Sequence, residues 1–220
     1  IAIQVRELLL SKENFGASEG PIAWEELETS LEEVSQFVEK DPKNLLLRIK
    51  RANFAYQLAT LKTRNQKPLN GLVELVIEDT TKCIAKPSLA RKALMLRALI
   101  RGTGAIEAAS GNQIMTSLKQ LDQSGLDFEL ILKQTPNYIP AYLFRAEIYF
   151  NALSRNPDGF LRLGGHTNVH SLLQVIYEDL TRVLAPADNA QAYLLRAQVE
   201  LLELFLHREE QQKKRDVISP

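Results

Sequence analysis

The phrase AYLFRAEIYF, at Ala141–Phe150, recurs as AYLLRAQVEL at Ala192–Leu201. Both copies share the pattern A-Y-L-x-R-A. The arginine–alanine pair inside this pattern occurs four times after leucine-rich sequence, and consecutive pairs lie 46, 48 and 51 residues apart. The four pairs begin at Arg51, Arg97, Arg145 and Arg196. Self-similarity at such a period is typical of a protein built from stacked repeats.

A proline stands nine or ten residues before each of these arginines. The four prolines are Pro42, Pro87, Pro136 and Pro186. Apolar residues between the prolines recur at intervals of three and four, which is the period of a helix. Proline is favoured in the first turn of a helix and disfavoured in its interior. Each unit is therefore predicted to consist of a helix, a proline-containing turn and a second helix.

These patterns predict an all-α fold, and no stretch favours a β-strand. We expect helices over residues 1–12, 22–40, 44–63, 71–85, 88–109, 113–134, 138–155, 169–185 and 189–214. We expect one domain over residues 1–220. Its repeat units are predicted at 1–41, 42–86, 87–135 and 136–185, followed by a terminal helix within 186–214. Residues 156–168 contain proline and glycine and are predicted to form a loop.

The composition is that of an ordinary globular protein, with 45% hydrophobic and 25% charged residues. Lysine plus arginine equals aspartate plus glutamate at 27 each, so the net charge is zero. This balance argues against a nucleic-acid-binding protein, which is normally basic. The apolar runs are too short to predict a membrane span.

Cys83 is the only cysteine, so the chain forms no internal disulfide. A single thiol fits a reducing compartment, and we expect a cytoplasmic protein. The periplasm is the alternative, because the sequence begins with Ile1 rather than Met, which is compatible with the removal of a targeting segment.

The repeated unit resembles the tetratricopeptide repeat (TPR) family. In that family the first helix carries a large residue, a small residue four positions later and often an aromatic residue three further on. Tyr142, Ala146 and Tyr149 match this pattern fully, and Asp41-Pro42 resembles the junction between two repeats. The resemblance implies a right-handed superhelix of paired helices that binds other proteins. The units depart from the family in length, because a TPR unit has 34 residues.

The resemblance also implies which residues line the inner, concave surface, where a helix or an extended peptide would dock. The candidates lie on the four first helices: Ile49, Asn53, Tyr56, Met95, Leu99, Leu143, Glu147, Phe150, Leu194, Gln198 and Leu201. Most of them are apolar. The alternative is that the long helices pack these residues into the core.

One branch of the family binds the carboxylate at the end of chaperone chains with lysine, asparagine and arginine side chains. Asn53 matches one asparagine of that clamp. The other positions do not match, because they hold Ile49, Leu96, Pro140 and Phe144. A desolvated carboxylate requires the missing cations, so we expect no site of this type.

The four repeated arginines are predicted to pair with acidic residues of the second helices. The candidate partners are Glu78, Asp79, Glu178 and Asp179. Such pairs contribute little if they are exposed. An anion-binding site is the alternative function of these arginines.

Few residues suggest catalysis or a metal. His166 and His170 are four apart, a spacing that suits metal on a helix, but no third ligand is near in sequence. Cys83 matches a small packing position, so an inert buried thiol is expected. The predicted loop 156–168 carries Phe160 and Leu163, and it is a candidate for contact with a partner.

We therefore expect a non-enzymatic scaffold or adaptor without a cofactor or metal. It would bind a protein or peptide in its concave groove. The alternative is a ligand-binding TPR-like component of a bacterial envelope or transport system. An enzyme that uses the region of His166 and His170 is a third hypothesis.

Overall fold

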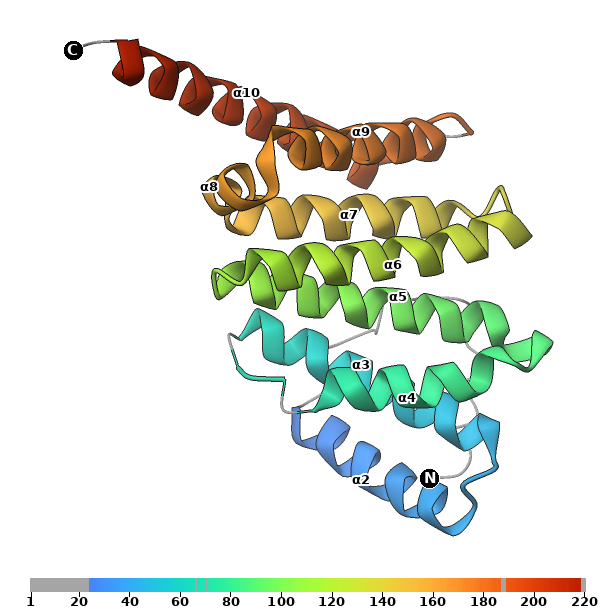
Figure 1. Ribbon diagram of the computed structural model, residues 1–220. Helices are drawn as coiled ribbons and strands as arrows, with labels where there is room; N and C mark the ends of the chain where they lie inside the picture. Colours follow the sequence, from blue (N-terminus) through green and yellow to red (C-terminus); the bar gives the residue numbers. More distant parts are fainter. Residues whose placement is uncertain (1–23, 66, 70, 187–188, 219–220) are drawn as a thin grey trace.

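The computed structural model describes residues 24–65, 67–69, 71–186 and 189–218, and these form helices without any strand. The helices stack one on another from α2 at one end to α10 at the other (Figure 1). Their bounds are α2 Trp24–Lys40, α3 Leu45–Arg64, α4 Leu72–Ile84, α5 Pro87–Ser110, α6 Ile114–Gln134, α7 Ile139–Arg155, α8 Pro157–Gly159, the π-helix η1 Phe160–Gly164, α9 Gly165–Leu184 and α10 Ala190–Ile218.

The predicted all-α fold is confirmed for this part of the chain, and most helix limits agree within a few residues. The predicted helix over 1–12, and with it most of the unit 1–41, lies outside the described residues. Of the four turn prolines, Pro87 stands in the first turn of α5, Pro42 and Pro136 lie in the turns before α3 and α7, and Pro186 lies in the bend after α9. In the first turn of a helix, a proline costs no hydrogen bond, because the N–H that it lacks would have no partner within the helix.

The first helix of each pair is followed by the second helix that covers it. The pairs are α3 with α4, α5 with α6, and α7 with α9. Successive first helices also pack on one another, α3 on α5 and α5 on α7. α10 packs on α7 and α9, so it takes the place of a fourth first helix.

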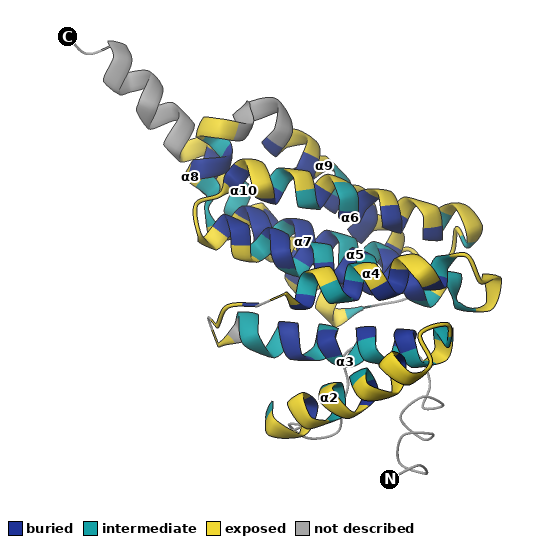
Figure 2. Ribbon diagram, turned by 60° about the horizontal axis from the view of Figure 1, so that its bottom comes forward, coloured by how far each residue is buried: buried dark blue, intermediate teal, exposed yellow. Residues whose placement is uncertain are grey.

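The hydrophobic core has two clusters that meet in α5. Leu96 and Ile100 belong to the cluster formed with α3 and α4, while Met95 and Leu99 belong to the cluster formed with α6, α7 and α9. Figure 2 shows buried residues along the lines where α5, α6 and α7 meet. A helix that is apolar on both sides is expected in the interior of a fold, and α5 has this place.

Two glycines permit this close packing. A Cβ atom on Gly102 would overlap the side chain of Ile148, and one on Gly125 would overlap the hydroxyl of Tyr149. α5 and α6 therefore approach α7 more closely than an alanine at either position would permit. Neither glycine belongs to a phosphate-binding turn, since both lie inside long helices.

The prediction of a loop over 156–168 is wrong. The segment contains α8, the π-helix η1 and the first turn of α9. Asn156 starts it, because its side-chain oxygen accepts a hydrogen bond from the Gly159 N–H at 2.9 Å. Phe160 then enters the core with no exposed surface. Burial of this ring and the Asn156 cap both stabilise the helical form of the segment.

Candidate functional site

Three of the four repeated arginines hold a buried aspartate of the paired second helix. Arg51 donates to Asp79 through Nε and Nη2, at 2.6 and 2.8 Å. Arg97 contacts Asp127 in the same bidentate way, at 3.0 and 2.6 Å. These contacts have the fork geometry that makes arginine–carboxylate pairs strong and directional.

The third pair joins Arg145 of α7 to Asp179 of α9, with both hydrogen bonds at 2.7 Å. Burial raises the pKa of the Asp179 carboxyl, and the hydrogen bonds and charge of Arg145 oppose that shift. Asp79 and Asp127 each receive a second arginine, Arg48 in one case at 2.6 Å and Arg101 in the other at 2.7 Å. The chain therefore repeats one ion pair along its stack, which we call the arginine–aspartate ladder.

The sequence predicted this ladder in part. Asp79 and Asp179 were among the candidate partners, and both make the contact. Glu78 instead pairs with Lys82 at 2.5 Å and Glu178 accepts from Gln174 at 2.9 Å. Sequence reasoning missed Asp127. The signal that identifies it is the distance to the next turn proline, since all three aspartates stand seven to nine residues before one.

The pairs of the ladder are buried, so the small contribution expected of exposed pairs does not apply to them. The aspartate side chains are at most 2% exposed. A buried pair is costly to form but costly to break, because loss of one partner leaves the other charge uncompensated. The arginines are thus bound in structural pairs, and this leaves no free cation for an anion site at Arg51, Arg97 or Arg145.

The fourth arginine lies at an open end of the ladder. Arg196 of α10 is 45% exposed, and the structure pairs it with Glu200 of its own helix at 3.5 Å. Among the described residues, no aspartate of a following helix reaches it. A pair of this exposure contributes little to stability.

α10 has an exposed apolar face beside Arg196. Its other face is buried on α7 and α9 through Ala192, Leu195, Val199 and Leu206. The exposed face extends over several turns and consists of Tyr193, Leu194, Ala197, Leu201, Leu204 and Phe205. Leu201 is 67% and Leu204 is 61% exposed. Large contiguous apolar patches on a protein surface mark sites of interaction.

The predicted groove residues fall into three groups along the stack. Ile49, Met95 and Leu99 are buried, and as residues of an open groove they were predicted wrongly. The reason is that successive first helices pack directly on one another. Met95 and Leu99 belong to the cluster that includes α7.

The second group is partly buried and the third is exposed. Asn53, Tyr56, Leu143, Glu147 and Phe150 are partly buried. Tyr56 packs against both core clusters, while Glu147 accepts a hydrogen bond from Gln191 of α10. Burial raises the pKa of the Glu147 carboxyl.

The exposed group lies on α10 and consists of Leu194, Gln198 and Leu201. These three residues are therefore the predicted groove positions that a partner can reach most fully. They share one helix with the open arginine.

The two partner-contact candidates of the segment 156–168, Phe160 and Leu163, differ in exposure. Phe160 is part of the core, so the prediction that it contacts a partner is wrong. Leu163 of η1 is 60% exposed and stays a candidate. His166 and the groups around it lie outside the side chains that the structure describes, so the proposed histidine pair is not placed. Cys83 is buried, and this burial raises the pKa of its thiol.

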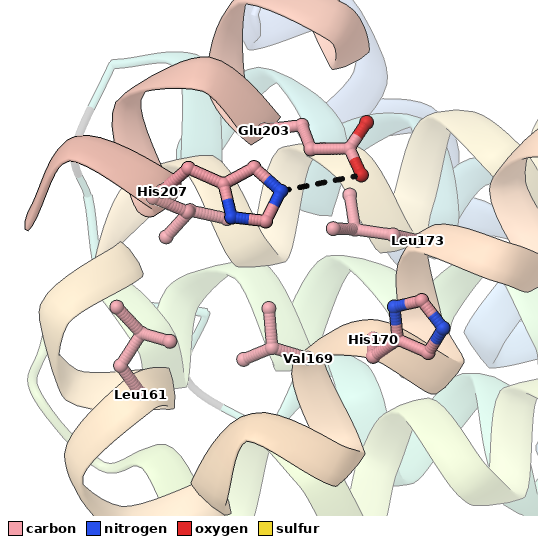
Figure 3. A pocket seen from close by; sticks show the side chains of 7 residues that line it. Leu161, Val169, His170, Leu173, Glu203 and His207 are labelled. Atoms are coloured by element: carbon pink, nitrogen blue, oxygen red, sulfur yellow. Dashed lines mark ion pairs between the residues drawn. The ribbon is translucent and has the colours of Figure 1, made fainter. Parts of the chain in front are cut away.

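A cavity of about 220 Å³ opens between η1, α9 and α10 (Figure 3). Leu161, Val169, Leu173 and Leu206 give it an apolar lining. Its polar groups are His170, Glu203 and His207, and His207 Nε2 lies 4.0 Å from Glu203 Oε1. Ligand pockets usually measure roughly 300–1,000 Å³. This cavity is smaller.

Comparison of the chain with protein-family models, with curated proteins and with solved structures finds no significant match. Within the described part of the chain, no helix combines the length and the apolar composition that crossing a bilayer requires. A functional conclusion therefore depends on the geometry of α10 and its surroundings.

Proposed function

We propose that this protein is a non-enzymatic interaction scaffold that binds a segment of a partner protein along α10. The proposal includes a right-handed, TPR-like superhelix with units longer than those of the family. The observation that carries it is the exposed apolar face of α10, opposite a face that is fully packed.

Comparison with α5 supports this proposal. α5 is apolar on both sides and is covered on both sides. α10 is apolar on both sides and is covered on one. Leaving several leucine side chains in water forgoes about 1.5–3 kcal/mol for each one that a partner would bury fully. A binding partner supplies that stabilisation.

Of the predicted groove residues, the proposal keeps those on α10. The partner segment would contact the exposed Leu194, Gln198 and Leu201 on α10. An apolar surface of this kind suits an amphipathic helix. The site would not be of the chaperone carboxylate-clamp type, since it lacks the set of cations that a clamp requires.

A ligand-binding component of an envelope or transport system stays a second proposal. The cavity between η1, α9 and α10 supports it, because it combines four apolar residues with two histidines and a glutamate. Its volume suits a small molecule of about the size of a substituted benzene.

Affinity capture tests the scaffold proposal. Tagged wild-type protein, Leu201→Glu and the control Leu126→Glu would be exposed to the same native lysate, and captured proteins would be quantified by mass spectrometry. Leu126 is a suitable control because it is 59% exposed on α6, far from α10 in the stack. We expect proteins that the wild type and the control retain and that Leu201→Glu loses. Equal capture by all three proteins would contradict the proposal.

A further inference from the structure

At the repeated arginine and at two further positions, the exposed face of α10 corresponds to residues that are buried or only slightly exposed in the other first helices. In α3, α5 and α7 the residue that follows the ladder arginine is an alanine without exposed surface. These residues are Ala52, Ala98 and Ala146. The residue eight positions after the arginine is also fully buried in all three helices. These residues are Ala59, Ala105 and Leu153.

In α10 the same two positions hold Ala197 and Leu204, and both are exposed. The arginine itself changes in the same way. It is 12–16% exposed in the three paired helices and 45% exposed at Arg196. Three independent positions on α10 thus present a surface that a second helix covers in every other pair.

The three second helices share a register around their aspartates. The residues three before, one after and four after each aspartate are buried. In α4 they are Val76, Thr80 and Cys83; in α6, Ser124, Phe128 and Ile131; in α9, Ile176, Leu180 and Val183. Side chains at this spacing lie on one face of a helix. The register is a small or apolar residue, two variable residues, aspartate, a buried residue, two variable residues and an apolar residue.

Charge also selects the occupant of the open face. Arg196 and Arg208 are exposed cations of α10, and Glu200, the intrahelical partner of Arg196, is 58% exposed. A second copy of the chain would bring the exposed face of its own α10. The described side chains of α10 include the acids Glu200 and Glu203 and no aspartate.

We propose that the open face of α10 binds an amphipathic helix of a partner protein that carries this register. Its aspartate would take both hydrogen bonds of Arg196 and replace Glu200. Its apolar residues would cover Ala197 and Leu204, whose equivalents on α7, Ala146 and Leu153, have no exposed surface. This inference rests on the proposed scaffold function and adds to it the chemistry of the partner.

Fluorescence anisotropy with a labelled peptide of residues 169–184 tests the inference. This peptide has the register of α9, including Asp179. With the whole protein, the wild-type peptide should bind saturably. The peptide variant Asp179→Asn and the protein variant Arg196→Met should each weaken binding about tenfold or more, because each removes a charge-assisted contact.

Three controls make the result specific. In the protein, Arg182→Met removes an exposed arginine of α9, on a different helix from Arg196, and should leave binding of the peptide unchanged. Leu204→Glu should abolish binding. The reversed pair, Arg196→Glu with peptide Asp179→Arg, should recover part of the affinity that either change loses alone.

The remaining outcomes decide between the inference and the scaffold function. Binding that Leu204→Glu abolishes but Asp179→Asn leaves unchanged would overturn the aspartate register and keep the scaffold. If neither Arg196→Met nor Leu204→Glu affected binding, the peptide would be replacing the protein's own α9 on α7. This result would count against the inference. Absence of saturable binding would overturn it too, while lysate capture would still test the scaffold independently. Self-association of the wild type in sedimentation velocity, lost in Leu204→Glu, would assign the face to a second copy instead.

Discussion

Arg97 of α5 and Asp127 of α6 form two parallel hydrogen bonds in the interior of the stack, Nε–Oδ2 at 3.0 Å and Nη2–Oδ1 at 2.6 Å. The carboxylate is 2% exposed and also receives Arg101. Two cations thus depend on one buried anion. This contact fixes the rotation of α6 relative to α5, because an arginine fork accepts a carboxylate in few orientations.

Removal of Asp127 should destabilise the protein strongly. Asp127→Ala leaves Arg97 and Arg101 without their carboxylate, and we expect a loss of about 3–5 kcal/mol in the free energy of unfolding. Urea denaturation followed by circular dichroism measures it. Asp122→Ala, in the same helix but exposed, should change the midpoint little. Equal midpoints for both variants would show that the buried contact does not hold.

Replacement of alanine by leucine should affect stability differently at two equivalent positions, Ala146 and Ala197. Ala146 has no exposed surface beneath α9, so Ala146→Leu should cost about 1–3 kcal/mol by overpacking. Ala197 has the same position on α10 and is exposed, so Ala197→Leu should stay within about 0.5 kcal/mol of the wild type. Thermal unfolding of the isolated chain compares the two. A large loss at Ala197 would mean that α10 is already covered.

Substitution of Phe160 and of Leu163 by alanine should change the free energy of unfolding by different amounts. Phe160→Ala removes a ring without exposed surface, and we expect a loss of about 3–5 kcal/mol. Leu163→Ala removes a side chain that is 60% exposed and should leave stability nearly unchanged. If Phe160→Ala were as stable as Leu163→Ala, residues 156–168 would be a surface loop after all.

Tyr149 should make stability depend on pH in alkaline solution. Burial raises the pKa of its hydroxyl to about 12, and the hydroxyl donates to the Leu121 carbonyl at 3.3 Å. The unfolded chain titrates near its ordinary value of about 10. The folded state therefore holds this proton more tightly, so the contribution of Tyr149 is complete below pH 10 and is lost as the pH rises to 12.

The size of this effect is at most about 3 kcal/mol, at 1.36 kcal/mol for each pKa unit. Urea denaturation across that pH range measures it, with Tyr149→Phe as the comparison. The variant lacks the titrating group, so its stability should fall less between pH 10 and pH 12. Parallel curves for the two proteins would contradict the assigned pKa.

The sequence predicts the limits of the helices well, but it predicts poorly which helices pack against one another. The intervals between prolines and the helical period of the apolar residues locate α3 to α7 within one or two residues, because both signals are local. Whether Met95 and Leu99 face a groove or another helix is not a local property. Their burial depends on α7, which Gly102 admits to close contact, and nothing in the sequence around Met95 reports that distance.

The ladder and the segment after α7 show the same limit. Asp79 and Asp179 follow glutamates in similar phrases, whereas Asp127 follows Leu126, so the similarity of the phrases does not identify Asp127. Proline and glycine at Pro157 and Gly159 indicate a loop, yet the Asn156 cap and the burial of Phe160 form a helix there. The open face of α10 is visible only when its residues are compared with the covered positions of the other first helices.

The place of α5 in both core clusters bears on how the protein unfolds. Melting of either half would leave one flank of α5 in water, so the loss of one cluster weakens the other. Coupling of this kind between neighbouring units makes a stack cooperative over a distance that no single unit spans. Amide hydrogens of α5 should accordingly exchange last, through opening of the whole molecule, while those at the ends exchange through fraying. A partner bound on α10 would slow this fraying from one end.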